Sequence, residues 1–156
     1  MVYQRTEAVQ YALRWALHRN PAYFDYESLG GDCTNFVSQV LRAGGAPMDF
    51  TETFGWYYRN ANDKAPAWTA VEPLYRYLMR KKGGGVTALL TDLHHLEPGD
   101  LIQFSFDGTH FQHTAVVTGS RGGVPLVCAH SIDARQRSLN TYEFQDIRFL
   151  HIVENI

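Results

Sequence analysis

The hydrophobic pattern of this 156-residue chain changes its period near the middle, and that change constrains the fold more than any other feature. In the first half, apolar residues recur at the spacing of α-helices, and helix-ending residues follow them. We predict one helix that stops at Asn20-Pro21, one that Asp32 caps and Gly44-Gly45 ends, and one from Pro73 to about Arg80. Residues 46–70 lack a clear period and are rich in aromatic residues, so a long packed loop is predicted there.

β-Branched and aromatic residues dominate the second half, where they alternate with polar residues between glycine turns. This pattern is typical of strands, which are predicted at 102–106, 113–118, 124–130 and 149–153. Helices followed by an antiparallel meander indicate an α+β fold, with the N-terminal helices packed on one antiparallel sheet. No repeat and no domain boundary interrupts the pattern, so residues 1–156 are predicted to form a single domain.

Composition excludes several classes of partner. The formal net charge of −2 gives no electrostatic reason to expect a nucleic acid or an anionic membrane surface as partner. No apolar run approaches the roughly 20 residues that span a membrane, and the N-terminus lacks the continuous hydrophobic region of a secretory signal. Membrane insertion is therefore not expected, and the compartment stays open. The two cysteines are too few for a disulfide framework.

Cys33 is the strongest candidate for chemistry, because it falls in the first turn of the second predicted helix. Unpaired N–H groups and the positive end of the helix dipole favour the thiolate there, and thiolate is the nucleophilic form of cysteine. Backbone N–H groups at the same helix end would hold a developing oxyanion. The structural alternative is that Cys33 is a small buried hydrophobic residue under the apolar face of the helix.

A cysteine nucleophile needs a base, and His113 is the candidate because it opens a predicted strand after a polar loop. His130 ends the neighbouring strand, from which its ring would orient His113 and complete a triad. Asp133, three residues further along the chain, competes for this orienting role. For any single histidine, a structural role is the simpler interpretation.

Two thiols and two imidazoles also make a conceivable structural zinc site, formed by Cys33, His113, Cys128 and His130. Their spacing argues against it, because no C-x2-C or H-x3-H pair occurs and a cysteine two residues before a histidine is an unusual chelate. No metal and no cofactor is therefore expected. Cys128 is predicted to pack on the sheet face as a small apolar residue.

Several short motifs occur together around these residues. They are GGDCTNFVSQ at 30–39, AGGAPM at 43–48, RNPAY at 19–23, WYY at 56–58, WT at 68–69, PGD at 98–100 and HT at 113–114. This set resembles the signature of the putative amidase domain family of Gram-positive bacteria, over nearly the whole chain. The GDCTNF core is far more specific than a lone cysteine.

That family is similar in arrangement to the NlpC-type and CHAP cell-wall hydrolases, which are circularly rearranged relatives of papain. The resemblance implies a papain-like fold in which a cysteine starts the central helix, a histidine starts the next major strand, and a third polar residue follows on the adjacent strand. Cys33, His113 and His130 fill these three places. The implied activity is that of a cysteine amidase or peptidase that forms a thioester acyl-enzyme and acts on peptides or peptidoglycan-derived peptides, outside the cell or at the cell wall.

Further predictions concern the substrate. Asp32 and Asn35 flank the nucleophile and are expected near the oxyanion or the substrate. Trp56 and Trp68 are expected to line the cleft, although aromatic residues in such a long loop often form its own core. The alternative function is a catalytically idle module that keeps the fold and presents an aromatic groove to peptides or glycans. Thiol reactivity separates the two, because an idle site has no need of a reactive cysteine.

Overall fold

The structure is a computed structural model that describes residues 2–153. Within this range it contains four α-helices and eight strands. The helices are α1 (Arg5–Trp15), α2 (Cys33–Ala43), α3 (Pro66–Thr69) and α4 (Val71–Leu78). The strands are β1 (Tyr58–Asn60), β2 (Asp63–Lys64), β3 (Ala88–Thr91), β4 (Leu101–Ser105), β5 (His113–Arg121), β6 (Val124–Ala129), β7 (Ala134–Ser138) and β8 (Asp146–Ile152).

Six of the strands form one antiparallel sheet in the order β3-β8-β4-β5-β6-β7. The prediction of an α+β fold with an antiparallel sheet is confirmed. The meander is correct for β4 to β7, but β8 lies inside the sheet between β3 and β4. The two edge strands, β3 and β7, were not predicted from the pattern.

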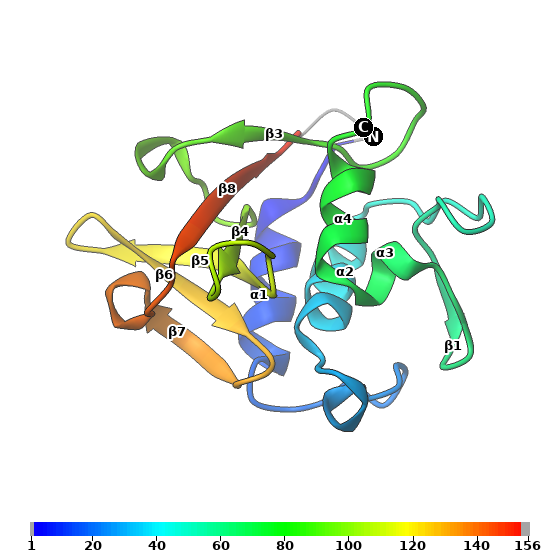
Figure 1. Cartoon of the computed structure of the whole chain (residues 1–156), viewed down its shortest axis with the longest axis horizontal. Coiled ribbons are helices and arrows are strands. Elements are labelled where there is room, and N and C mark those ends of the chain that lie inside the picture. The colour runs from blue at the N-terminus through cyan, green and yellow to red at the C-terminus, as the bar shows by residue number, and fades with distance from the viewer. Residues whose placement is uncertain (1, 154–156) are drawn as a thin grey trace.

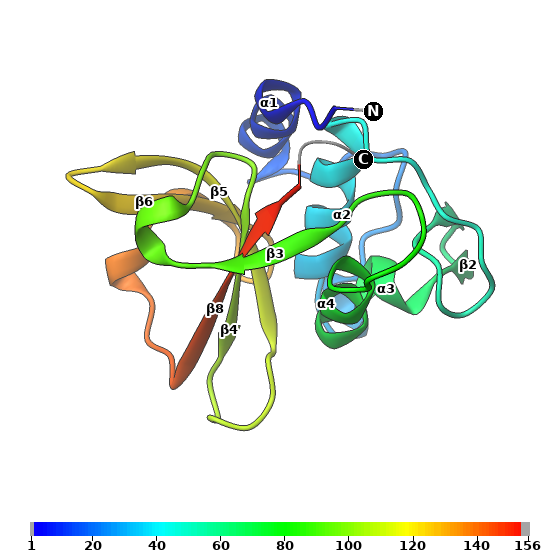
Figure 2. The same ribbon diagram turned by 90° about the horizontal axis from the view of Figure 1, so that it is seen from above.

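The helices lie to one side of the sheet, as Figures 1 and 2 show. Helix α2 is the central one, because it contacts β5 on one side and α3 on the other. Side chains alternate along β5: Val116 joins the core under the helices, whereas Ala115 and Val117 join a second core on the opposite face. We call these the helix-side core and the far-side core. Cys128 is fully buried in the helix-side core, as expected of a small apolar residue.

Hydrogen bonds connect the start of α1 to the C-terminal end of β8. The Arg5 guanidinium donates hydrogen bonds to the Ile152 carbonyl oxygen at 2.7 Å and to the Asp100 carboxylate at 2.8 Å. Beside it, the Tyr3 ring lies over Gly44, where an added Cβ would be only 2.3 Å from a ring carbon. Only glycine leaves room for that ring.

The helix boundaries correct the sequence prediction in three places. Helix α1 ends at Trp15, earlier than Asn20-Pro21, and α4 begins at Val71 and not at Pro73. The segment 46–70 is not all loop, since it folds as the β1–β2 hairpin followed by α3. Burial explains this order, because Trp56 and Trp68 are both fully buried there and fix the surrounding backbone.

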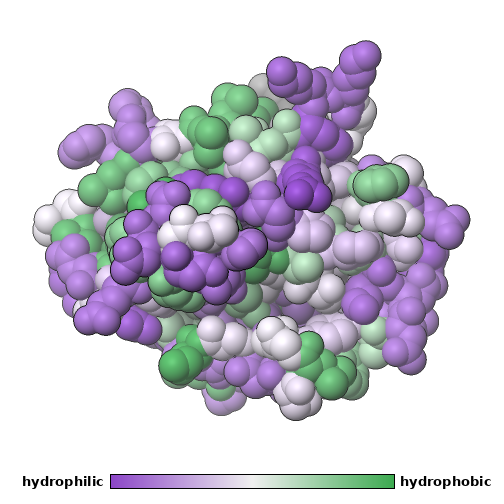
Figure 3. Space-filling view, in the orientation of Figure 1, coloured by the Kyte–Doolittle hydropathy of each residue, from purple (hydrophilic) through white to green (hydrophobic). Residues whose placement is uncertain are grey.

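The surface offers no extended apolar face in the view of Figure 3, where hydrophobic side chains form separate green patches among hydrophilic ones. Among the residues that the structure describes, no helix combines the length and the hydrophobicity that crossing a membrane requires.

Candidate active site

Cys33 is the first residue of α2 and is 8% exposed. Its thiol lies 3.7 Å from the Thr34 hydroxyl, and the backbone N–H of Thr114 is near enough to lower the pKa of the thiol. That N–H belongs to the peptide bond that joins Thr114 to His113. The N-terminal end of α2 and the first residues of β5 therefore meet near the sulfur atom.

The charge state of Cys33 differs from the sequence prediction. Burial raises the pKa of the thiol, and hydrogen bonds from Thr114 and Thr34, which lower it, do not compensate. The nearby Asp32 charge raises the pKa further. The helix N-terminus was expected to favour the thiolate, but removal of the sulfur from water outweighs that effect. The Cys33 side chain is therefore a neutral thiol near pH 7.

His113 is also buried, with 5% of its surface exposed. Its ring lies on the far-side core, with ring centroids 5.7 Å from Phe104 and 6.2 Å from Tyr142. Burial, and to a smaller degree the Arg137 charge, lower the pKa of His113 to about 4. The imidazole is therefore neutral near pH 7 and able to accept a proton. Within residues 2–153 it makes no hydrogen bond with the Cys33 thiol, as is common for catalytic pairs before substrate binds.

The lowered pKa of His113 predicts stability that is sensitive to acid. Because the pKa falls from 6.5 to about 4 on folding, the unfolded chain binds a proton between these pH values and the folded chain does not. His113 therefore contributes to the free energy of unfolding above its unfolded-state pKa of 6.5. That contribution is lost as the pH falls toward its folded-state pKa of about 4, and the total loss is roughly 3 kcal/mol at most.

Urea unfolding at several pH values measures the effect. His113→Gln should flatten the loss of stability relative to wild type between roughly pH 6.5 and pH 4. His110→Gln, which removes an exposed imidazole, is the matched control and should keep the wild-type slope. If the free energy of unfolding of wild type and of His113→Gln changed equally with pH, the lowered pKa of His113 would be contradicted.

Asp32 occupies the N-cap position of α2, yet its side chain makes no capping hydrogen bond. The carboxylate instead accepts hydrogen bonds from the Tyr26 backbone N–H at 2.9 Å and from the Asn35 side-chain amide at 2.9 Å. Its second oxygen lies 2.6 Å from Nδ1 of His130. The predicted cap is therefore wrong in its chemistry, because the side chain points into a buried polar network.

His130 does not take the role of orienting His113 in this arrangement. Its ring is 1% exposed, stacks on Phe36 at 4.1 Å, and places Nε2 2.8 Å from the Trp15 carbonyl oxygen. The carbonyl and the Asp32 carboxylate are both acceptors, so the two ring nitrogens are both satisfied only when each carries a proton, or when the carboxyl group holds one of the two. Neither nitrogen remains available for His113.

The rival orienting residue is engaged elsewhere as well. Asp133 forms a bidentate ion pair with Arg19, with N–O distances of 2.9 and 3.0 Å. Although burial acts to raise the pKa of Asp133, this pair holds it below its ordinary value. Tyr142 lies beside His113, with ring centroids 6.2 Å apart; its buried hydroxyl makes no hydrogen bond of ordinary geometry within the described residues, and the Arg137 guanidinium lies over its ring. No sequence pattern indicated this residue, because the turn that contains it was not predicted.

The predicted substrate-binding residues lie in the interior. The Asn35 amide donates to Asp32 and to the Phe24 carbonyl oxygen, and its oxygen accepts from the Trp68 indole at 3.0 Å. Trp56 donates to the Ser38 hydroxyl at 3.0 Å. Both indoles are completely buried, so they form the core of their segment and do not line an open cleft. Asp32 and Asn35 therefore stabilise the N-terminal end of α2 through buried hydrogen bonds.

Metal-type side chains gather at one other place in the described range. Glu97, Asp100 and His151 lie with their ligand atoms within 4.8 Å of one another. The Arg5 guanidinium already binds Asp100 there, so a cation occupies the position that a metal would take. None of the four residues considered for zinc belongs to this group; they are Cys33, His113, Cys128 and His130.

Comparison with known proteins gives a family. The family model described as "Putative amidase domain" matches residues 2–153. A Bacillus subtilis (strain 168) protein named "Uncharacterized protein YhbB" is 36% identical over 98% of this chain and 51% of its own length. A second one, "Uncharacterized protein YjcM", is 30% identical over 82% of this chain and 30% of its own length. The chain thus spans about half of the first relative and less than a third of the second, and no solved structure matches it.

Proposed function

We propose, from the premise that this chain belongs to the Putative amidase domain family, that it hydrolyses amide bonds with Cys33 as the nucleophile and His113 as the base. The observation that carries the proposal is the contact between the Cys33 thiol and the peptide bond that follows His113. The backbone of two segments 80 residues apart, one of which carries the thiol and the other the imidazole, meets there at a helix N-terminus. A papain-like fold of the NlpC or CHAP type is part of the same proposal.

The reaction begins from a neutral pair. His113 accepts the thiol proton as the sulfur attacks the carbonyl carbon, and backbone N–H groups at the start of α2 stabilise the oxyanion. The imidazolium then protonates the leaving amine, and a thioester remains on Cys33. Water, activated by the same imidazole, hydrolyses the thioester and restores the thiol. Because the ring lies against Phe104 and Tyr142, it must turn toward the sulfur when substrate enters.

Asp32 and His130 support this chemistry without touching the reacting atoms. Their buried pair connects the residue before Cys33 to β6 and, through the Trp15 carbonyl, to α1. This connection fixes the helix end whose N–H groups would bind the oxyanion. We assign them as positioning residues.

A second candidate function is the catalytically idle binding module. It is favoured by one specific observation: a thiol with a raised pKa and an imidazole with a pKa of about 4 that share no hydrogen bond in the described structure. Proton transfer between such groups is unfavourable until the site is rearranged.

Peptidoglycan peptides, the substrate class implied by the resemblance, separate the two functions. The protein should be incubated with intact peptidoglycan and with its soluble stem-peptide fragments, and the products analysed by mass spectrometry. Hydrolysis should create a new amine and a new carboxylate at one defined bond, and acid quenching should trap an acyl group on Cys33. Cys33→Ala is the control and should give neither. Peptide binding without product or adduct would favour the idle module.

A further inference from the structure

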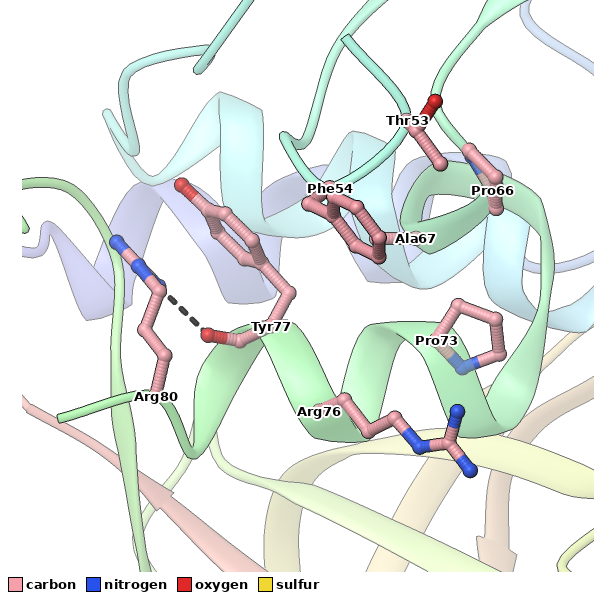
Figure 4. Close-up of a pocket in the computed structure, with 8 residues that line it drawn as sticks. All are labelled: Thr53, Phe54, Pro66, Ala67, Pro73, Arg76, Tyr77 and Arg80. Atoms are coloured by element: carbon pink, nitrogen blue, oxygen red, sulfur yellow. Dashed lines mark hydrogen bonds between the residues drawn. The ribbon is translucent and has the colours of Figure 1, made fainter. Parts of the chain in front are cut away.

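The cavity on the outer side of α3 and α4 lies away from the site described above. It has a volume of about 380 Å³, in the range typical of small-ligand pockets. Its apolar walls are supplied by Phe54, Pro66, Ala67, Pro73 and Tyr77. Figure 4 shows the Phe54 ring projecting over the helices toward Ala67. Phe54 is 83% exposed, so it forms a wall of the cavity without being part of the core.

Positive charge accompanies this apolar surface. Arg76 and Arg80 line the cavity, and its eight lining residues include no Asp or Glu. Arg80 is held by the carbonyl oxygens of Tyr77 and Val86, at 2.6 and 2.7 Å, and its guanidinium lies over the Tyr77 ring. These contacts fix its position; within residues 2–153 it forms no direct ion pair, although its charge contributes to the lowered pKa of the Asp49 carboxyl.

Arg76 is different, because it makes no hydrogen bond or ion pair with any residue in the described range. Its natural partner on the helix would be Glu72, four residues earlier. Glu72 is instead bound by Arg148 at 2.9 Å. In Figure 4 the Arg76 side chain extends along α4 toward Pro73, at the rim of the cavity. A planar guanidinium without a partner is suited to bidentate recognition of a carboxylate.

We propose that this cavity binds a carboxylate joined directly to an apolar side chain, as in an N-acylated apolar amino acid or the C-terminal residue of a peptide. The carboxylate pairs with Arg76, and the side chain fills the space between Phe54 and Pro73. Neither Cys33 nor His113 lines this cavity. The segment of Phe54 follows the C-terminal end of α2, whereas Cys33 starts that helix. Binding here does not depend on catalysis.

N-acetylphenylalanine and N-acetyl-Ala-Ala-Phe are suitable probes, compared with their C-terminal amides by isothermal titration calorimetry on the full chain. We expect saturable binding of both acids, and about tenfold or greater weakening for the amides, because a charge-assisted hydrogen bond is lost. The acid that binds more tightly identifies the source, a single residue or a peptide end. Cys33→Ala should bind the acids as wild type does, which separates this site from the proposed active site.

Two variants test whether the probes bind at Arg76 and Phe54. Arg76→Gln should weaken acid binding by about tenfold or more and leave amide binding unchanged, and Phe54→Ala should weaken both acid and amide. Arg121→Gln removes one exposed charge from the β5–β6 hairpin and is the matched control, with wild-type affinity expected. Absence of saturable binding, equal affinity for acid and amide, or wild-type affinity in Arg76→Gln would each overturn the proposal.

Discussion

Alanine in place of Cys33 is expected to reduce kcat for amide hydrolysis by about 10⁴-fold or more, because no other group in the site can form the acyl-enzyme. The fold should be unaffected, since alanine is smaller than cysteine and is the best helix former. Initial rates on the peptide identified by mass spectrometry, together with urea unfolding, measure the two properties separately. His113→Ala should cost nearly as much activity, because this imidazole transfers protons in both half-reactions.

Cys128→Ala is the matched control for the nucleophile. It removes the other thiol of the chain, which is completely buried in the helix-side core. The folded Cys128→Ala protein should retain the wild-type kcat, even if it is less stable. Activity that survives in Cys33→Ala but disappears in Cys128→Ala would mean that the wrong cysteine has been assigned.

Removal of the His130 ring is expected to destabilise the protein by about 3 kcal/mol, because the buried Asp32 carboxylate loses its closest partner and keeps only Tyr26, Asn35 and, at 3.6 Å, Arg19. Both His130 and Asp32 are 1% exposed, so water cannot replace the lost contact. The ring also fills the space beside Phe36, which adds a packing loss. The free energy of unfolding of His130→Ala by urea denaturation, compared with wild type, gives the value.

A double-mutant cycle identifies the cause of that loss. Asp32→Ala combined with His130→Ala should cost less than the sum of the two single changes, because the second change no longer strands a charge. His110→Ala breaks a histidine–aspartate contact of the same chemistry that is exposed, and it should change stability little. Additive losses at Asp32 and His130 would show that the two side chains do not act as a pair.

Much of the fold follows from periodicity, because the elements that were predicted are those with a buried face. Helix α2 and strands β4, β5 and β6 carry long runs of buried residues, and the pattern of apolar side chains reveals them. Strands β3 and β7 are sheet edges. β7 reads Ala-Arg-Gln-Arg-Ser, and its polar side chains give no alternation to detect. Backbone pairing with β6, rather than burial, makes it a strand.

In the candidate site as well, features set by local sequence could be predicted, and features set by distant contacts could not. Cys33 at a helix start and His113 at a strand start could be predicted locally, and the fold brings both segments together. The partners of His130 could not be predicted, because the Trp15 carbonyl lies 115 residues away in sequence and belongs to the backbone. The thiolate prediction failed for a related reason: a helix end is visible in sequence, but the depth of its burial is not.

The length of helix α1 separates the two ends of the described chain from Cys33. Its first residue, Arg5, holds the carbonyl of Ile152, so the two ends of the described chain meet at that end of the helix. Its last residue, Trp15, contacts the network behind Cys33 at the other end, about 16 Å away for 11 residues. Flanking segments of the kind present in the longer relatives would leave the domain on the side remote from the thiol. A segment attached there would lie at the end of the domain opposite Cys33.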